Sequence, residues 1–312
     1  MTMTDKNDLV IDVEGLKKSF KGKPAVNGVS LKVRRGDIFG FLGPNGSGKT
    51  TTIRMICGLL TPDAGHGRCL GHDLLTEAGR IKQNTGYMTQ RFSLYEDLTV
   101  RENLDFIARM YGVLHRKETV DECLTTIGLK DQQDKLAGTL SGGWQRRLAL
   151  AACLVHKPGL LLLDEPTAGV DPRARCDFWD RIHELSSEGT TTLVSTHYMD
   201  EAEHCNKLAY IVSGELLTEG SPEEIVKESG LVTWIVTGPD IWPLARELSG
   251  LPGVAHVAAF GASLHVSGYD EAALREGLKP FIDAKHRFEF SKPGLEDVFI
   301  CLMKQAGAGR MR

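Results

Sequence analysis

The sequence predicts a two-domain α/β protein, with a large parallel-sheet domain followed by a small α+β domain. The length of 312 residues exceeds one average domain. The short apolar runs "GLLLLDEP" and "TTTLVSTH" flank a helical pattern that ends at Gly189, and strand, helix, strand is the order found in parallel sheets. The pattern changes again near Gly230. We therefore expect domains at residues 8–228 and 231–312.

Strands come first in the large domain. "LVIDVEGLKKSF" and "VNGVSLKVRRGDIFGFLG" alternate or run apolar between glycines and charged residues, which indicates strands. "TVRENLDFIARMYGV" and "KETVDECLTTIGL" instead carry apolar residues at helical spacing, each preceded by threonine or another capping residue. We expect a helical insert at about residues 91–160.

The second domain has its own order of elements. The expected segments are a strand at 231–237, a helix at 240–248, two strands between 254 and 267, a helix at 271–282, a strand at 287–290 and a helix from 295. This β-α-β-β-α-β order is the split βαβ arrangement.

Composition narrows the classes of partner and compartment. The net charge of −4 gives no basic surplus, so nucleic acid is a poor candidate partner. The seven cysteines are scattered without a C-x-x-C pair, which is typical of reduced thiols in a cytosolic protein. The sequence has no apolar signal core and no run of about 18 apolar residues, so we expect that the chain does not cross a membrane by itself.

The segment "GPNGSGKT" fits the pattern G-x-x-x-x-G-K-[ST], between the apolar run "DIFGFL" and the helical pattern "TTIRMICGLL". Glycines let backbone N–H groups turn toward phosphate oxygens, and a helix amino terminus favours the anion. Lys49 is expected to bridge the β- and γ-phosphates, with the Thr50 hydroxyl on Mg²⁺. A flexible loop is the alternative. The predicted nucleotide-binding residues are Gly43, Pro44, Asn45, Gly46, Ser47, Gly48, Lys49, Thr50 and Thr51.

Paired carboxylates follow the run of leucines in "LLLLDEP". Asp164 is expected to hold Mg²⁺ directly or through water, and Glu165 to polarise the attacking water as general base. A solvated acidic turn after a core strand is the alternative interpretation.

A second glycine pair opens a helix in "LSGGWQRRLALAACLV". Ser141 has a hydroxyl to donate to a γ-phosphate, Gly142 and Gly143 permit close backbone approach, and the positive helix end faces the anion. "SGG" alone is a weak signal, because such triplets are common in loops.

With "GPNGSGKT", "LSGG" and "LLLLDEPTAGVD" in that order, the first 228 residues or so resemble the ATP-binding subunit of ABC transporters. The resemblance implies a P-loop NTPase core with an antiparallel β subdomain and a helical insert. It implies ATPase activity with ATP and Mg²⁺. It also implies a homodimer or pseudo-dimer packed head to tail, in which "LSGG" of one cassette closes over the ATP held by the other.

The resemblance extends to four further residues. Gln90 in "YMTQ" matches the glutamine that contacts Mg²⁺ and the attacking water, and His197 matches the histidine that contacts the γ-phosphate. Asp171 in "AGVD" matches the loop that crosses the dimer interface, and Phe20 the aromatic residue that stacks on adenine. The alternatives are a surface glutamine, an incidental histidine, a helix cap before Pro172 and a core phenylalanine.

Two later stretches of the sequence indicate one subfamily of these ATP-binding subunits. "STHYMDEAEHCNKLAYIVSGELLTEGSPEEI" and "GLEDVF" are similar to the ATPases of ABC-2-type exporters, the group containing daunorubicin-resistance ATPases, which also carry a small carboxy-terminal domain. Trp144 stands where the wider family most often has glutamine, although tryptophan is not foreign to this group. Thr89 stands where proline is frequent, a minor departure.

A subunit of this kind implies an ABC-2-type transmembrane permease, which holds the chain at the cytoplasmic face of the membrane as a peripheral subunit. We expect the permease to dock on "RFSLYEDLTVRENLDF", with Phe92, Leu94 and Tyr95 at the groove. An amphipathic helix buried in its own domain is the alternative. No motif identifies the exported molecule, whether drug, lipid or another compound.

Other functions remain open. The family includes ATPases of translation and chromosome maintenance, which carry two cassettes or a long coiled coil, whereas about fifty residues separate Gln90 from Ser141 here. A sensor that uses ATP only as a conformational ligand is a third possibility, and the presence of Glu165 and His197 argues against it. The carboxy-terminal domain carries no catalytic pattern, and we expect it to have a dimer-contact or regulatory role.

Overall fold

The computed structural model describes residues 8–282 and 285–309. The chain divides into two compact units, Met1–Leu216 and Leu217–Arg312. The division falls inside strand β10 (Glu215–Gly220), so helix α8 (Pro222–Glu228), which the sequence analysis assigned to the first domain, belongs to the second unit.

The first unit is built on a six-stranded central sheet with the order β10-β9-β3-β8-β7-β6. The strand bounds are β3 Ile38–Leu42, β6 Thr85–Met88, β7 Leu160–Asp164, β8 Thr191–Thr196 and β9 Lys207–Val212. The pairs β3 with β8 and β9, and β7 with β6 and β8, are all parallel. Every residue of β3, β7 and β8 is buried, as expected for strands covered on both faces. The predicted parallel strands are therefore confirmed.

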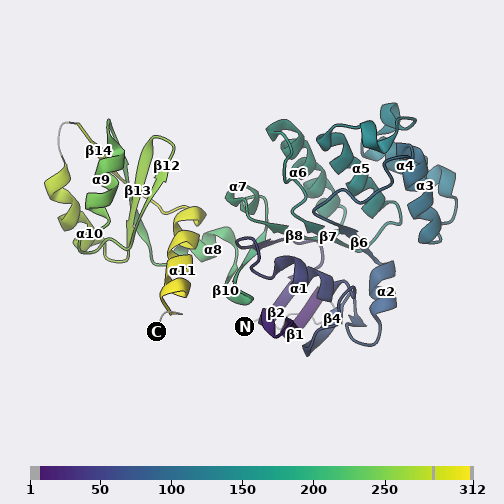
Figure 1. Ribbon diagram of the computed structural model, residues 1–312, viewed down its shortest axis with the longest axis horizontal. Helices are drawn as coiled ribbons and strands as arrows, with labels where there is room; N and C mark the ends of the chain where they lie inside the picture. Colours follow the sequence, from purple (N-terminus) through teal and green to yellow (C-terminus); the bar gives the residue numbers. More distant parts are fainter. Residues whose placement is uncertain (1–7, 283–284, 310–312) are drawn as a thin grey trace. The chain divides into compact units, whose positions relative to one another are not determined.

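A second, antiparallel sheet has the order β2-β1-β4-β5. Its strands are β1 Leu9–Phe20, β2 Lys23–Arg34, β4 Ala64–Cys69 and β5 His72–Asp73. Figure 1 shows helix α1 (Lys49–Ile56) between this sheet and the central one. One hydrophobic core joins all three, with Val13 and Leu31 from the antiparallel sheet, Ile53 from α1, and Phe41 and Leu162 from the central sheet.

Helices complete the first unit (Figure 1). They are α2 Ala78–Gln83, α3 Val100–Met110, α4 Arg116–Thr126, α5 Gly142–Leu154, α6 Pro172–Ser187 and α7 Met199–Ala202. Helices α3, α4 and α5 form the predicted insert, with short 3₁₀ turns at Lys130–Gln132 and Ala137–Thr139. Thr99 and Glu102 make a capping box at the start of α3. Helix α4 instead follows His115, which adopts the left-handed conformation.

The second unit contains the sheet β12-β13-β11-β14, in which every pair is antiparallel. Its strands are β11 Val232–Thr237, β12 His256–Phe260, β13 Ser263–Gly268 and β14 Arg287–Ser291, and its further helices are α9 Ile241–Leu248, α10 Glu271–Leu278 and α11 Leu295–Gly309. The predicted β-α-β-β-α-β order is confirmed. The helix expected to reach Ile282 ends at Leu278 and continues as the 3₁₀ turn Lys279–Phe281, in which Pro280 has no N–H to donate.

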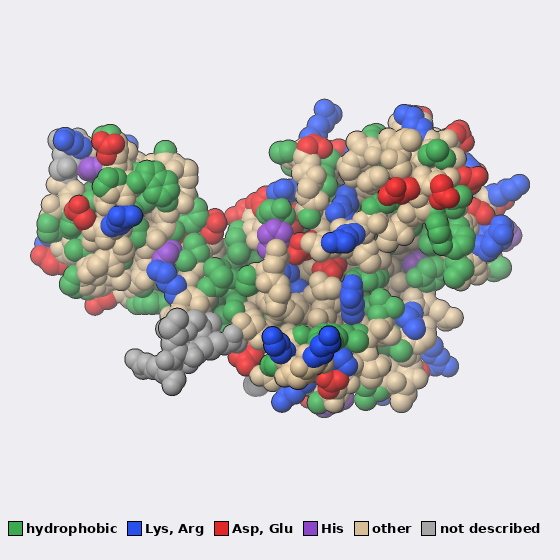
Figure 2. Space-filling view, in the orientation of Figure 1, with side chains coloured by type: hydrophobic (Ala, Val, Ile, Leu, Met, Phe, Trp, Pro, Cys, Tyr) green, Lys and Arg blue, Asp and Glu red, His purple; other side chains and the backbone are tan. Residues whose placement is uncertain are grey.

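The surface shows no preference for one sign of charge on the face in Figure 2, where acidic and basic side chains are interspersed over both units. This distribution agrees with the net charge of −4. Among the residues that the structure describes, no helix combines the length and the apolar character that a bilayer span requires.

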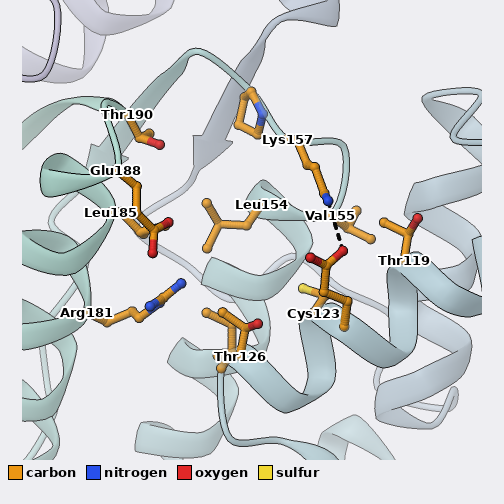
Figure 3. Close-up of a pocket in the computed structure, with 13 residues that line it drawn as sticks. Thr119, Cys123, Thr126, Leu154, Val155, Lys157, Arg181, Leu185, Glu188 and Thr190 are labelled. Carbon is orange, nitrogen blue, oxygen red and sulfur yellow. Dashed lines mark hydrogen bonds and ion pairs between the residues drawn. The ribbon is translucent and has the colours of Figure 1, made fainter.

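A cavity of about 420 Å³ lies where the helical insert meets α6 (Figure 3). Its walls include Cys123 of α4, Leu154 of α5 and Leu185 of α6, and an ion pair of 2.8 Å between Lys157 and Glu122 lies at its side. Burial raises the pKa of the Cys123 thiol to about 12, so this thiol stays protonated and unreactive at neutral pH. None of the predicted nucleotide-binding residues lines this cavity.

Candidate nucleotide-binding site

The carboxyl ends of four neighbouring parallel strands meet at one edge of the central sheet, in the order β3-β8-β7-β6. The last residue of β3, Leu42, pairs with Thr196, and the last residue of β7, Asp164, pairs with Ser195. The loops that follow these strands therefore open side by side. Ligands bind at such edges in open α/β sheets.

The glycine-rich loop runs from the end of β3 to the start of α1, and its shape depends on glycine at two positions. A Cβ atom at Gly43 would lie 2.1 Å from the Ile211 carbonyl oxygen, and one at Gly48 would lie 2.5 Å from the Ala25 carbonyl oxygen. Both glycines have positive φ, 154° and 108°. The loop lines a cavity of about 370 Å³.

One buried hydroxyl in this loop, that of Ser47, lacks a hydrogen-bond partner among the described residues. The Ser47 side chain is buried, and no residue in the ranges 8–282 and 285–309 makes a hydrogen bond to its Oγ atom. A buried polar atom in this state costs free energy unless a ligand satisfies it. The glycine-rich loop, the amino terminus of helix α1 that follows it and this hydroxyl together suit a bound phosphate group.

Lys49 supplies a buried positive charge. Its Nζ atom donates hydrogen bonds to the carbonyl oxygens of Gly43 (2.6 Å) and Pro44 (3.1 Å) and lies 3.9 Å from Oε1 of Glu165. Burial lowers the pKa of Lys49, and the charges of Glu165 and Asp164 oppose this shift. The ammonium group lies over the loop, where it can contact phosphate oxygens.

Oxygen ligands converge next to this lysine. Thr50 donates to Oδ1 of Asp164 over 3.1 Å, and Ser195 donates to the same oxygen over 2.5 Å. Asp164 is buried, with 3% of its surface exposed. A carboxylate beside a hydroxyl is the donor set that Mg²⁺ prefers beside a phosphate. Thr50 and Asp164 therefore fit the predicted metal site.

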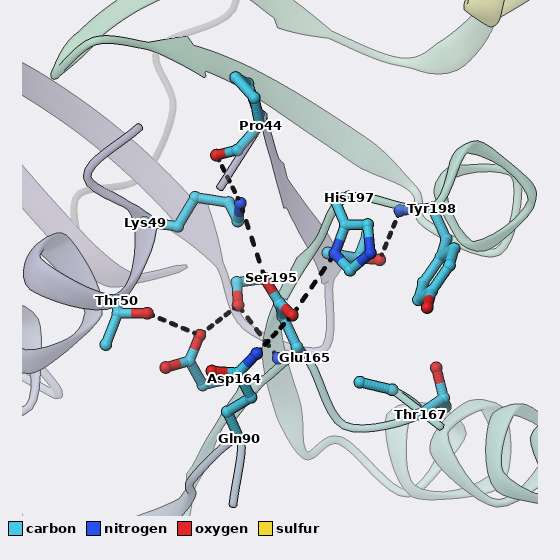
Figure 4. Close-up of polar contacts among 12 residues, drawn as sticks. Pro44, Lys49, Thr50, Gln90, Asp164, Glu165, Thr167, Ser195, His197 and Tyr198 are labelled. Carbon is cyan, nitrogen blue, oxygen red and sulfur yellow. Dashed lines mark hydrogen bonds and ion pairs between the residues drawn. The ribbon is translucent and has the colours of Figure 1, made fainter. Parts of the chain in front are cut away.

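Glu165 combines an unusual backbone conformation with two side-chain neighbours. It adopts a left-handed backbone conformation with φ of 47°, which is uncommon outside glycine and concentrates at functional sites. Gln90 donates to its Oε2 atom over 2.8 Å, and Nδ1 of His197 lies 3.4 Å from the same atom. Figure 4 shows the Glu165 carboxylate between Gln90 and His197. Gln90 and Glu165 both line the cavity.

The loop that carries His197 is tied to neighbouring segments. The N–H of Tyr198 donates to the Thr196 hydroxyl over 3.0 Å. Thr167 donates to the buried Glu201 carboxylate, and Arg175 of α6 makes a 2.8 Å ion pair with Asp200. These interactions hold His197 beside Glu165.

The remaining predicted residues lie apart from this cavity. Ser141 precedes α5 and Asp171 caps α6, where its Oδ1 atom accepts from the Ala174 N–H over 3.0 Å. A Cβ atom at Gly143 would lie 3.2 Å from the Ala174 side chain and 3.9 Å from Oδ2 of Asp171, so the two loops are neighbours. Phe20 ends β1 with 49% of its surface exposed. The phosphate cavity is not lined by five of the predicted residues, namely Ser141, Gly142, Gly143, Asp171 and Phe20.

Ser195 is a further residue of the site that no sequence motif indicates. Besides its bond to Asp164, its Oγ atom accepts from the Glu165 N–H over 3.1 Å, so one hydroxyl fixes both acidic residues. The available signal was a hydroxyl two residues before His197 at the end of a strand. The pairing that sets Ser195 beside Asp164 is not visible in the sequence.

Ser195→Ala is expected to raise the Mg²⁺ concentration that gives half-maximal ATPase activity by about tenfold, because Asp164 loses the shorter of the two hydrogen bonds that orient it. The measurement is an ATPase titration with Mg²⁺ at fixed ATP. Ser195→Thr keeps the hydroxyl and should restore most of the Mg²⁺ affinity. Equal Mg²⁺ dependence in the alanine variant and the parent would contradict the assigned role.

Comparison with known proteins gives one family. The family model described as ABC transporter matches residues 26–168. The chain is 39% identical over 296 residues to the Nod factor export ATP-binding protein I of Burkholderia lata, which covers 94% of this chain and 96% of that protein. It is 43% identical over 224 residues to the probable multidrug ABC transporter ATP-binding protein YbhF of Escherichia coli K12, covering 71% of this chain but only 39% of YbhF.

A solved structure agrees with these matches. The dimeric, post-hydrolysis structure of an ATP-binding cassette bound to ADP and Pi superposes with a TM-score of 0.63 at 26% identity, over 68% of this chain and 98% of that one. The predicted P-loop fold is therefore confirmed. The matching motifs, the long alignment and the common fold lead to one conclusion: the chain belongs to the ABC transporter family.

Proposed function

We propose that this chain hydrolyses ATP to power a membrane exporter. The observation that carries the proposal is the convergence of Lys49, Asp164 and Glu165 on a loop shaped for phosphate. The relatives named for Nod factor export and for multidrug transport support the export direction. An exporter of the ABC-2 type is the finer proposal, and it rests on the sequence stretches noted above.

The proposed reaction uses residues already in contact. Glu165 accepts a proton from a water molecule, whose oxygen attacks the γ-phosphorus while the bond to the β-phosphate oxygen breaks and ADP leaves. Gln90 holds the Glu165 carboxylate through its hydrogen bond, and His197 lies beside this carboxylate, where it would contact the γ-phosphate. Lys49 stabilises charge on the phosphate oxygens. Mg²⁺ held by Thr50, Asp164 and Gln90 would neutralise charge on the same oxygens.

The separation of Ser141, Gly142, Gly143 and Asp171 from the phosphate cavity has an explanation in a head-to-tail dimer. In that arrangement, the start of α5 serves the nucleotide held by a second cassette rather than its own. The dimeric state of the ADP-bound and Pi-bound relative supports this proposal. ATP then stabilises the dimer because it contacts both cassettes, and hydrolysis removes that stabilisation.

We assign the docking of a transmembrane permease, at the cytoplasmic face of the membrane, to the loop before α3. Tyr95 is 52% exposed there, and its ring meets Phe106 edge to face at 5.2 Å. Buried Asn103 fixes the loop, since it accepts from the Tyr95 N–H and donates to the Tyr95 carbonyl, both over 2.9 Å. Phe92 and Leu94 are partly buried beside it. The loop therefore presents an aromatic ring on a rigid base.

Tyr95→Glu is expected to abolish co-purification of this chain with the proposed transmembrane permease, because burying a carboxylate against an apolar partner surface costs free energy. ATP binding should stay unchanged. The matched control is Leu75→Glu, since Leu75 is exposed to a similar extent, 51%, outside the insert. Equal recovery of the membrane protein with Tyr95→Glu and the parent would refute the docking assignment.

We also propose a dimer-contact or regulatory role for the carboxy-terminal unit. Its sheet and helices have a separate hydrophobic core with Val236, Leu248 and Leu264 at its centre, so the unit has the packing of an independent module. Truncation after Gly220, which keeps strand β10 and removes α8 with the rest of this unit, is expected to change the oligomeric state or the ATPase rate. Light scattering and phosphate release measure the two quantities, and no change in either would rule the role out.

A further inference from the structure

Two histidines from different segments of the first unit bring ring nitrogens close together. His183 lies on α6, and His204 follows the short helix α7. Nε2 of His183 is 3.4 Å from Nδ1 of His204, with ring centroids 5.6 Å apart and planes tilted by 53°. Both side chains are exposed, so solvent reaches the space in front of the two nitrogens.

A buried tryptophan holds one of these rings in place. Trp179, one turn before His183 on α6, stacks on His204 with centroids 4.8 Å apart and planes within 12°. The same indole lies 6.3 Å from the His183 ring. Because Trp179 is fixed in the core, the pair has a defined orientation in the absence of any ligand.

The distance between the nitrogens is that of a long hydrogen bond, and it also suits two ligands of one metal ion. At 3.4 Å it exceeds the range of about 2.7–3.2 Å usual for nitrogen donors in proteins. Two histidine nitrogens bound to one tetrahedral Zn²⁺, each at about 2.0–2.1 Å, are about 3.3 Å apart. The observed spacing therefore matches a chelating pair.

We propose that His183 and His204 form a site for a divalent transition metal such as Zn²⁺, with water in the other coordination positions. Neutral imidazole is a common ligand for these ions. No cluster of three or more His, Cys, Asp and Glu side chains suited to a metal occurs in the described part of the chain, so two protein ligands define this site.

A metal at this pair would join α6 to the segment that follows His197, a neighbour of Glu165. Helix α6 begins at the Asp171 cap, and the segment that ends at His204 begins just after His197. The bound ion would restrict movement of one relative to the other. The site is separate from the phosphate cavity, and its existence does not depend on the proposed ATPase function.

The test is isothermal titration of the full, untagged and nucleotide-free chain with ZnCl₂ in a buffer that does not chelate metals. All proteins carry Cys176→Ser, because this exposed thiol on α6 is an alternative ligand. We expect one Zn²⁺ per chain. His183→Gln and His204→Gln should each weaken binding by more than about tenfold, since loss of a direct ligand exceeds the effect of losing an outer partner.

The matched control is His66→Gln, because His66 is an exposed histidine 3.7 Å from Glu14 and should keep the parent affinity. His183→Gln leaves the stack of His204 on Trp179 in place. This variant therefore tests Zn²⁺ binding by the pair even if His204→Gln is unstable. Zn²⁺ should also raise the unfolding temperature of the parent and of His66→Gln only. A parent that binds no Zn²⁺, or a His183→Gln variant with parent affinity, would overturn the proposal.

Discussion

Replacing Glu165 with glutamine is expected to slow ATP turnover by about 10²–10⁴-fold while ATP affinity stays within about threefold of the parent. The amide has the shape of the carboxylate but cannot accept the proton of the attacking water. Gln90 and His197 both lie next to Oε2 of this side chain, so the substitution changes the carboxylate at the middle of the candidate catalytic site. Phosphate release under saturating Mg²⁺-ATP measures the rate.

Glu203→Gln makes the same chemical change at an exposed position after α7 and should leave turnover unchanged. A Glu165→Gln variant that hydrolyses ATP at the parent rate would exclude Glu165 as the base. A Glu165→Gln variant that fails to bind ATP would instead indicate that the substitution damages the loop.

Lys49→Met is expected to weaken ATP binding by about 10–100-fold. Hydrogen bonds to charged groups contribute about 1.5–3 kcal/mol each, and methionine keeps an unbranched apolar chain of similar length without the charge. The buried ammonium donates to the carbonyl oxygens of Gly43 and Pro44, and a bound phosphate group would replace these acceptors. Equilibrium binding of ATP, measured by calorimetry, gives the affinity.

The control for this variant is Lys157→Met, which removes an exposed lysine paired with Glu122 away from the phosphate cavity. It should bind ATP as the parent does. Unchanged affinity in Lys49→Met would contradict the placement of phosphate on the glycine-rich loop.

Features encoded by neighbouring residues could be predicted from the sequence. The leucine run of β7, the capping box at Thr99 and the alternation of short elements after Gly230 each have a local cause. Strand β4 has no such local signal, because its sequence "AGHGRC" lacks an apolar pattern. It forms through close approach to β1: a Cβ atom at Gly65 would lie 2.5 Å from the Gly15 carbonyl oxygen.

The site also contains residues that local motifs predict and residues whose roles depend on contacts between distant segments. Lys49, Thr50, Asp164 and Glu165 belong to contiguous motifs, and the structure gathers them with Gln90 and His197. Ser195 escaped prediction because its role depends on strand register, which connects residues far apart in the chain. The link between Thr167 and Glu201 is nonlocal in the same way.

The molar mass of Glu165→Gln in solution, measured by light scattering with and without Mg²⁺-ATP, tests the central proposal most directly. The chain has a mass of 34.2 kDa. We predict a dimer with Mg²⁺-ATP and a monomer without it, because two cassettes trap nucleotide that cannot be hydrolysed. A variant that binds ATP yet stays monomeric at every protein concentration would contradict a site completed by a second cassette.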